Sequence, residues 1–349
     1  MELTPANRLY IFMLEWIASQ RVRSNNIPNS LSRIASKLTL ISCNASHTTL
    51  VYKNESFSYS FGNSKIDYEN FVALIPPVVQ YVSSSSSMPV FIVIIRTYIG
   101  HQLHLIRLLR GLIKQTETRQ AIQVKIYILC TEYNSLSPIH QLLTTYMPRL
   151  LPSIQRPFEI NLFNFTEPFY LDEDFNPLAK RLQYLCSPPY ISVMKARWGL
   201  TANEIRRTCA MNNPVHYFLT DLSIHYALRS CENCRYLLIT NGDNYYYKSY
   251  LMTVLPHIEN GRFDMTLSSW NHRGIMKSVL SPSLGQVDLG CAIFRIPLLR
   301  SMNSTSLVNS LPSCADARDF YAADGHYIKR LVNMDARYKI LEHRLFDHN

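Results

Sequence analysis

Apolar residues beyond residue 88 follow two patterns that alternate along the chain. Short apolar runs typical of buried strands lie at residues 88–95, 124–130, 158–165, 235–240, 263–270, 287–296 and 338–346. Helical spacing occurs at residues 101–115, 217–231 and 320–334, and the first of these segments repeats Leu103, Ile106, Leu109 and Leu112 on one face. Strands that alternate with helices predict an α/β fold of the Rossmann type, with a mainly parallel sheet flanked by helices and joined by right-handed crossovers.

The first 82 residues follow a different pattern. Residues 9–18 form an amphipathic helical pattern, and residues 38–61 alternate between polar and apolar positions in a way that predicts short strands. Five consecutive serines at 83–87 then interrupt the composition and indicate a flexible boundary. We therefore expect a β-rich accessory region of unknown role at 1–88 and an α/β domain at 89–349.

Composition and charge limit the classes of protein to which the chain can belong. With 47% hydrophobic and 17% charged residues, the 349-residue chain is globular. Its net charge of +10 favours anionic ligands, but Lys and Arg form no block of five or more, so we expect no nucleic-acid partner. The 10 glycines form neither GxGxxG nor GxxxxGK[ST], which argues against dinucleotide Rossmann enzymes, P-loop NTPases and protein kinases. A phosphate site here must depend on a metal, on side chains or on a helix terminus.

The cysteines and glycosylation sequons bear on the compartment. There are 8 cysteines, and Cys231 and Cys234 form a single CxxC whose isolation favours a structural role over zinc binding or redox catalysis. Asn-x-Ser/Thr acceptors occur at Asn44, Asn54, Asn164 and Asn303. These features slightly favour the secretory pathway or Golgi lumen, and a glycoprotein, over the cytoplasm. No apolar run reaches about 18 residues, so we expect no transmembrane segment in this chain.

The most informative stretch is TNGDN at residues 240–244, which directly follows the apolar run 236–239. Asn-Gly and Gly-Asp are common turn dipeptides, so a tight turn is one interpretation. The other is a metal and phosphate site, because open α/β sheets bind ligands at the carboxyl ends of their strands. Asp243 would then hold a divalent cation, Asn241 would orient it, and Gly242 would let a phosphate or ribose approach the backbone. Placement after an uncharged buried strand favours the second interpretation.

Other polar residues follow predicted strands or begin helices. Arg96, Thr97 and Tyr98 end the first strand and could bind a phosphate and stack a base, or be ordinary surface residues. The acidic segment 172–174 (DED) is a rival metal site, although a solvated loop is the better interpretation because no clean strand precedes it.

Two further groups of residues each have more than one possible role. Asp288 and Gly290 lie ahead of a strand, and Asp324 lies near a helix start, where it is either a cap or a general base for an acceptor hydroxyl. His343 and His348, near the C-terminus, are either surface residues or ligands that complete the metal site.

Several of these pieces, taken in order, resemble a known family. The segments VIIRTYIGH, LIRLLRGL, YFLTDLSIHYAL, CRYLLITNGDNYY, VDLGCAIFR and ADGHYIKRL resemble GT-A-fold nucleotide-diphospho-sugar glycosyltransferases, in particular proteins that carry TNGDN in place of the Asp-x-Asp motif. The resemblance covers residues 89–349 and is most specific between residues 220 and 245. It implies a hexosyltransferase-like enzyme that moves a sugar from a UDP- or GDP-sugar to an acceptor hydroxyl on a glycan, protein or lipid.

The resemblance also implies roles for individual residues. The donor would contact Arg96, Thr97, Tyr98, Asp221, Asn241, Gly242 and Gly290. Asp243, Asn241 and His348 would hold Mn²⁺ or Mg²⁺, and Asp324 would be the base if the anomeric configuration inverts. Asn241 stands where the family has its first Asp and brings no charge, so metal affinity should fall. That departure leaves a catalytically inactive nucleotide- or carbohydrate-binding protein of the same fold as the alternative.

Overall fold

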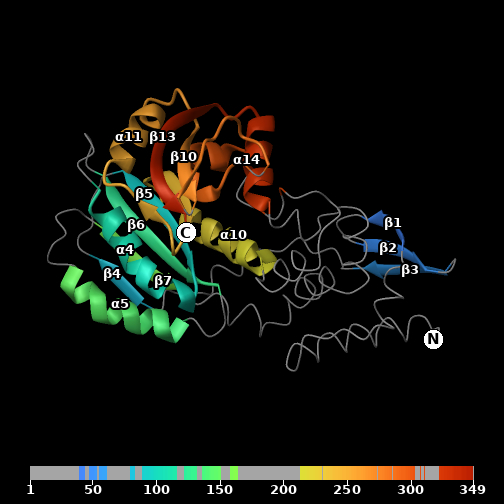
Figure 1. Ribbon diagram of the computed structural model, residues 1–349, viewed down its shortest axis with the longest axis horizontal. Helices are drawn as coiled ribbons and strands as arrows, with labels where there is room; N and C mark the ends of the chain where they lie inside the picture. The colour runs from blue at the N-terminus through green and yellow to red at the C-terminus, as the bar shows by residue number, and fades with distance from the viewer. Residues whose placement is uncertain are drawn as a thin grey trace. The chain divides into compact units, whose positions relative to one another are not determined.

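The computed structural model describes residues 39–43, 47–52, 55–60, 79–82, 89–115, 122–131, 136–150, 158–163, 213–229, 231–272, 274–284, 286–302, 307, 310 and 322–348. The chain divides into two compact units (Figure 1). One comprises Met1–Ile66, Tyr170–Val215 and Leu311–Tyr321, and the other comprises Asp67–Phe169, His216–Ser310 and Ala322–Asn349. The predicted helix at 9–18, the acidic segment 172–174 and the acceptor asparagines of all four glycosylation sequons lie outside the described residues.

The described part of the first unit is mainly a small antiparallel sheet. Strands β1 (Thr39–Cys43), β2 (His47–Tyr52) and β3 (Glu55–Ser60) pair in that order, with Leu50 opposite both Leu40 and Phe57. These are the short strands that the polar–apolar alternation at 38–61 predicts.

The second unit is built on a 10-stranded sheet with the order β4-β7-β6-β5-β8-β12-β10-β13-β9, to which β11 adds beside β10. The bounds are β4 Val79–Val82, β5 Val90–Thr97, β6 Gln123–Cys130, β7 Phe158–Phe163, β8 Cys234–Asn241, β9 Tyr245–Tyr246, β10 Met265–His272, β11 Ile275–Lys277, β12 Ala292–Arg295 and β13 Tyr338–His348. Strands β5, β6, β7, β8, β10 and β13 run in one direction, and β4, β9, β11 and β12 run the other way. The predicted α/β class with a mainly parallel sheet is confirmed.

Strand β4 precedes the serine run at which we expected the domain boundary, yet it pairs with β7 in the main sheet, with Val79 opposite Leu162. The boundary near residue 88 stays a prediction, and this strand shows that the main sheet begins before it.

The centre of the sheet explains the longest apolar run in the sequence. Every residue of β5 is buried, and β6 and β8 pair with its two edges. A strand buried on both faces needs apolar residues at every position rather than at alternate ones. Arg96 and Thr97 are the last residues of the strand, two positions beyond the apolar run that ends at Ile95.

Helices lie beside the strands of the sheet. Their bounds are η1 Ile99–His101, α4 Gln102–Ile113, α5 Leu136–Leu150, α10 Asn213–Arg229, α11 Tyr250–Glu259, η4 Leu289–Cys291, α12 Ile296–Ser301 and α14 Ala323–Asn333. Figure 1 shows α4 and α5 beside the half of the sheet that holds β4 to β7, and α11 and α14 beside β10 and β13. Among the described residues, no helix combines the length and the apolar character that a membrane crossing requires.

Two sequence predictions need correction here. Leu103, which we placed on the buried face of α4, is 84% exposed, and the helix buries Leu105 and Leu108 beside the predicted Ile106, Leu109 and Leu112. The predicted strand at 287–296 is a strand only at Ala292–Arg295, because residues 289–291 form a 3₁₀ turn that Asp288 caps.

Four cysteines of the second unit are buried: Cys130, Cys231, Cys234 and Cys291. Cys231 and Cys234 form a disulfide where β8 begins, in agreement with the structural role expected for this CxxC. Arg300 of α12 donates hydrogen bonds to the carbonyl oxygens of Leu228 and Cys231, at 2.8 Å each. The contacts hold the C-terminal end of α10 against the start of β8. Cys130 and Cys291 are free thiols in the core.

Candidate functional site

The two strand-end motifs meet because β5 and β8 are parallel neighbours. Arg96 is the register partner of Asn241, and the Gly242 N–H donates to the Arg96 carbonyl oxygen at 2.8 Å. The sequence segments RTY and NGD, separated by more than 140 positions in the chain, therefore lie side by side at the carboxyl ends of adjacent strands. This is the edge at which open α/β sheets bind ligands.

Close packing explains why residue 242 is a glycine, and the sequence did not reveal this. A Cβ at this position would lie 2.6 Å from Thr97 Oγ1 and 3.1 Å from His101 Nδ1. Only glycine fits so close to the neighbouring strand. Its predicted contact with a phosphate or ribose stays a prediction.

Residues 242–244 form the turn that the first interpretation of TNGDN predicts. The Asn244 N–H donates to the Asn241 carbonyl oxygen at 3.2 Å, and Asn244 Nδ2 donates to Thr240 Oγ1 at 2.9 Å. Tyr246 ties the turn to a second segment, because its hydroxyl lies 2.9 Å from Thr240 Oγ1 and donates to the Gly290 carbonyl oxygen at 2.8 Å. These hydrogen bonds hold the turn in place and fix the position of Asp243.

Asp243 faces a histidine rather than bulk solvent. Its Oδ2 lies 3.6 Å from His101 Nε2, and its side chain is 18% exposed. Burial lowers the pKa of His101, and the Asp243 carboxylate opposes that effect. His101 comes from η1, directly after β5, and Tyr98 stacks on it with 3.9 Å between the ring centroids.

Arg96 is a buried cation at the centre of the site. Its side chain lies over the ring of Tyr217 from α10, 5.3 Å from the centroid, and the residue is 7% exposed. Burial disfavours the charged guanidinium, but Asp324, Tyr217 and Asp288 outweigh it, and the pKa of Arg96 is raised. The guanidinium therefore keeps its positive charge in a largely dry environment.

Asp324 supports this region from the first turn of α14. It is 8% exposed, its Oδ2 accepts a hydrogen bond from the Leu289 N–H at 3.1 Å, and it also bonds to the Tyr217 side chain. Burial raises the pKa of Asp324, Arg96 lowers it, and the negative charge of Asp288 raises it further. The carboxylate holds the 288–290 turn and Arg96, which is a positioning role. Its predicted role as general base stays a prediction.

Of Asp288 and Asp324, Asp288 has the more accessible carboxylate. Its Oδ1 accepts the Gly290 N–H at 2.7 Å, and its Oδ2 lies 3.7 Å from His348 Nδ1 with the side chain 15% exposed. A Cβ on Gly290 would lie 2.8 Å from Asp288 Oδ1 and 2.9 Å from Asn244 Nδ2. Gly290 therefore packs closely between the TNGDN turn and Asp288 at the edge of the site.

His348 reaches the site from the end of β13. It is the register partner of His272 in β10, with 5.1 Å between the two ring centroids, and its electrostatic influence extends to His101. His343, the other histidine considered as a ligand, is exposed on the same strand.

Asp221 lies on α10 in a different environment from the other predicted donor residues. It is fully buried, and its Oδ1 accepts a hydrogen bond from the Leu307 N–H at 2.6 Å. This contact anchors the chain after α12 to α10. A contact of Asp221 with ribose or base stays a prediction.

The charged cluster is defined here as Arg96, His101, Asp243, Asp288, Asp324 and His348. The structure brings these residues together from six separate segments of the chain, and the sequence reasoning missed two parts of the arrangement. His101 follows β5 closely enough that the strand-end argument applied to Arg96 could have found it. Tyr217 had no such signal, because only the packing of α10 against β5 places its ring beside Arg96.

A divalent cation fits this cluster only in part. Mg²⁺ and Mn²⁺ prefer oxygen ligands and are commonly held by one or two carboxylates together with substrate phosphates. Asp243 and Asp288 supply such oxygens, and each has an imidazole within 3.7 Å. Within the described ranges, no three His, Cys, Asp or Glu side chains converge as a metal site. The donor set therefore fits an ion shared with a bound diphosphate, and Asp243, Asn241 and His348 as its ligands stay predictions.

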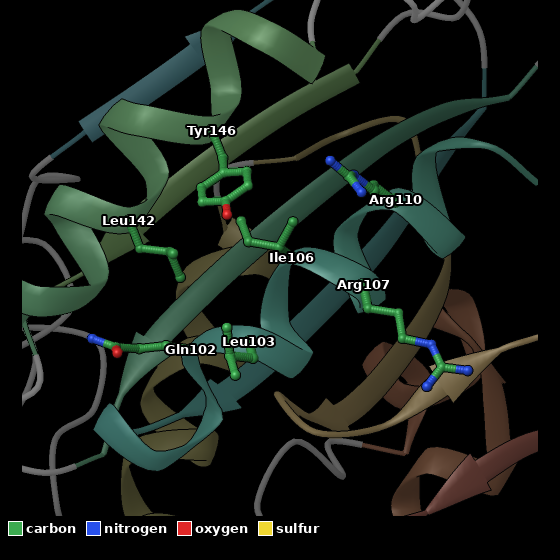
Figure 2. A pocket seen from close by; sticks show the side chains of 7 residues that line it. All are labelled: Gln102, Leu103, Ile106, Arg107, Arg110, Leu142 and Tyr146. Carbon is green, nitrogen blue, oxygen red and sulfur yellow. The ribbon is translucent and has the colours of Figure 1, made fainter.

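A separate cavity lies between α4 and α5 (Figure 2). It has a volume of about 220 Å³ and is lined by Gln102, Leu103, Ile106, Arg107, Arg110, Leu142 and Tyr146. In Figure 2 the Arg107 side chain extends away from Tyr146. The Arg107 guanidinium lies over the ring of Tyr245, 4.1 Å from the centroid. None of these lining residues belongs to the charged cluster.

Comparisons with known proteins return weak structural likenesses. No protein-family model and no curated protein sequence matches the chain. Over 74% of its length the chain is similar to S. aureus TarS 1–349 in complex with UDP, at 14% identity and a TM-score of 0.41. Over 80% it is similar to the mannosyltransferase PcManGT from Pyrobaculum calidifontis in complex with GDP-Man and Mn²⁺, at 12% identity and a TM-score of 0.42. The matches cover 60% and 61% of those chains, so this chain spans about three fifths of their length. The activity of this chain has to be inferred from its own residues.

Proposed function

We propose that the protein is a glycosyltransferase of the GT-A type that transfers a sugar from a UDP- or GDP-sugar to an acceptor hydroxyl. The observation that carries the proposal is the charged cluster at the carboxyl ends of β5 and β8, where a buried arginine lies beside several carboxylates. A nucleotide-diphosphate leaving group needs positive charge held in place in a site with little water. The order of the sequence motifs, which resembles this family, is the second support.

Each residue of the cluster has a stated role in this proposal. Arg96 holds its charge because Tyr217 and Asp324 surround it, and it binds the departing diphosphate. Asp288, more exposed than Asp324, would accept the proton of an acceptor hydroxyl, and His348 lies beside it with its Nδ1 3.7 Å from the carboxylate. Asp324 positions both through its bonds to Leu289 and Tyr217.

Mn²⁺ or Mg²⁺, when bound between Asp243 and a diphosphate, would neutralise negative charge on the leaving group. His101 lies 3.6 Å from Asp243 and helps to orient its carboxylate. Asn241, which extends β8 to its last residue, adds an amide and no charge at the same corner. Metal dependence should therefore be weaker than for a site with two aspartates.

The proposal is tested by binding and turnover in one series. Thermal shift with a panel of UDP- and GDP-sugars, with and without Mn²⁺, identifies the donor, because a ligand of the native state raises its stability. Hydrolysis or transfer of that donor is then followed by product analysis. Asp243→Ala should abolish turnover, and Asp174→Ala, in the rival acidic segment, should leave it unchanged.

Three results have distinct meanings. Full turnover by Asp243→Ala contradicts the assigned site, and loss of turnover only in Asp174→Ala moves it to residues 172–174. Nucleotide-sugar binding without turnover under any metal condition supports the alternative, an inactive nucleotide-binding protein of the same fold.

The compartment is proposed on separate grounds. The disulfide between Cys231 and Cys234 supports an oxidising environment such as the secretory pathway. Together with the sequons, it favours the Golgi lumen as the place of action. Free-thiol labelling of the native protein from its source cells checks this, because a cytoplasmic protein would show both thiols reduced.

A further inference from the structure

An exposed apolar segment adjoins the charged cluster at the far end of β10. After β10 the chain turns at Gly274, whose φ is +85°, and returns as β11. Four large apolar side chains between residues 275 and 284 are exposed: Ile275 by 62%, Met276 by 47%, Leu280 by 78% and Leu284 by 43%. All four lie within one ten-residue segment, and exposed apolar residues concentrated along the chain in this way mark a binding surface more often than scattered ones do.

The segment is held in place against the sheet. Val279 is 2% exposed, and its N–H donates to Ser269 Oγ at 3.4 Å. The polar groups of the segment bond to one another, since Ser281 Oγ lies 3.0 Å from Ser283 Oγ and 3.3 Å from Gln286 Oε1. An anchored backbone and internally paired hydroxyls leave the apolar side chains as the part that can meet a ligand.

The strand register connects this surface directly to the charged cluster. Ile275 is the partner of His272, and His272 is the partner of His348 on its other side. His348 in turn lies 3.7 Å from Asp288. The apolar surface thus begins two strands away from the carboxylate that we assign to the acceptor hydroxyl.

We propose that residues 275–284 bind the alkyl chain of an amphiphilic acceptor, whose hydroxyl then lies at Asp288. This inference rests on the proposed function, because it names the class of acceptor for the same site. An acceptor that reaches Asp288 from this side passes along β11. A purely polar acceptor would leave Ile275, Met276, Leu280 and Leu284 in water, whereas an alkyl chain covers them.

Trp270 provides a local probe for the test. It lies in β10 opposite Lys277 of β11, and its ring is 5.3 Å from that of His348. The chain has 3 tryptophans, so Trp16→Phe with Trp198→Phe leaves Trp270 as the sole reporter. Its fluorescence is titrated with methyl, hexyl and octyl β-glucoside, all below their micelle concentrations.

We expect octyl glucoside to shift the Trp270 emission saturably and methyl glucoside not to shift it. Affinity should rise from hexyl to octyl by up to about fourfold for each methylene buried. Ile275→Ser combined with Leu280→Ser should weaken octyl binding at least tenfold. Leu103→Ser, which removes an equally exposed leucine from α4, is the matched control and should bind as the parent does.

Three outcomes overturn the inference. Equal responses to methyl and octyl glucoside would show that the chain length is not sensed, and unchanged octyl binding by the double serine variant would place the binding elsewhere. Sedimentation that shows a dimer for the parent and a monomer for the double serine variant would make the segment a self-association surface. Thermal unfolding of each variant confirms that it is folded, which is expected because both substituted side chains are exposed.

The fluorescence titration tests the proposed acceptor surface independently of the proposed function. Alkyl binding at Trp270 needs neither donor nor turnover, so it can hold even where no nucleotide sugar binds. Conversely, a protein that binds and turns over a nucleotide sugar but ignores alkyl chains keeps its proposed function and loses the proposed acceptor class.

Discussion

The main-chain N–H of Gly242 donates a hydrogen bond to the carbonyl oxygen of Arg96 at 2.8 Å. This contact continues the pairing of β8 with β5 by one residue and fixes the distance between two segments of the site. It also brings the α-carbon of Gly242 so close to Thr97 that a side chain has no space. The contact therefore links the stability of the strand ends to the geometry of the charged cluster.

Gly242→Ala should destabilise the protein and impair donor binding together. Its Cβ would lie 2.6 Å from Thr97 Oγ1 and 3.0 Å from Thr97 Cβ, so the strand ends must move apart. Overpacking of this kind typically costs about 1–3 kcal/mol of the free energy of unfolding. Urea unfolding and thermal shift with the donor measure the two effects.

Two further variants test whether the contact with Thr97 causes that result. Thr97→Ala removes the nearest atom, so the double variant with Gly242→Ala should lose less stability than the sum of the two single changes. Gly274→Ala, at a turn with a positive φ and nothing within 4 Å, tests strain without a clash and should leave donor binding intact. Strict additivity of the first pair would show that the contact with Thr97 is not the cause.

Arg96 and Asp324 should behave as one unit in unfolding experiments. Arg96→Met removes a buried cation and leaves the Asp324 carboxylate without its main opposite charge, which typically costs about 3–5 kcal/mol. Adding Asp324→Asn removes the unpaired charge, so the double variant should be more stable than Arg96→Met alone. Donor binding should be lost in both, because neither retains the guanidinium. A double variant less stable than Arg96→Met would contradict the pairing.

The fold was largely predictable from the sequence, because its signals are local. Continuous apolar runs such as residues 90–95 require burial on both faces, and this identified β5 and its neighbours in the sheet. The errors also have local causes. Leu103 lies in the first turn of α4, where helical periodicity alone could not tell that the helix end projects into solvent. Asp288 interrupts a predicted strand because it caps a 3₁₀ turn through the Gly290 N–H.

The candidate site was predictable only where it lies at strand ends. Arg96 and Asn241 could be placed at one edge because parallel strands end together, and their register confirms that reasoning. The environment of Asp324 could not be predicted, since its bonds to Leu289 and Tyr217 depend on how α10 and α14 pack on the sheet. Long-range side-chain contacts of that kind leave no periodic signal in the sequence.

Asp324 should make stability fall as the pH rises above the acid range. Burial raises its pKa, Arg96 opposes this effect, and the charge of Asp288 adds to it, so the folded pKa lies above the unfolded value of about 3.9. Its contribution to stability is complete below that value and is lost as the pH rises through the folded pKa. Asp324→Asn does not titrate, so its stability relative to the parent should increase from about pH 4 upward and then level off. Urea unfolding at a series of pH values measures this, and a relative stability that falls with pH would contradict it.

Asp264 should show the opposite pH dependence. It joins the ends of β10, β12 and β13, because its carboxylate accepts the Arg337 N–H at 3.1 Å, Arg337 Nε at 2.9 Å and Arg295 Nη1 at 3.3 Å. Burial alone would raise its pKa, but the hydrogen bonds from Arg337 and the charges of Arg337 and Arg295 lower it. The folded pKa lies below the unfolded value, so this stability is present above about pH 3.9 and is lost as the pH falls through the folded pKa.

Asp264→Asn should therefore lower the free energy of unfolding by about 1 kcal/mol at pH 7, because the amide keeps the shape of the side chain but loses the charge that its partners need. The deficit should shrink as the pH is lowered, since the parent then protonates and comes to resemble the variant. Asp335→Asn is the matched control, because this turn residue has a φ of 65° that asparagine tolerates, and it should be as stable as the parent at pH 7. Urea unfolding between pH 3 and 7 measures all three proteins. A deficit that stays constant down to pH 3 would show that the geometry of the Asp264 hydrogen bonds, rather than the charge, joins these strand ends.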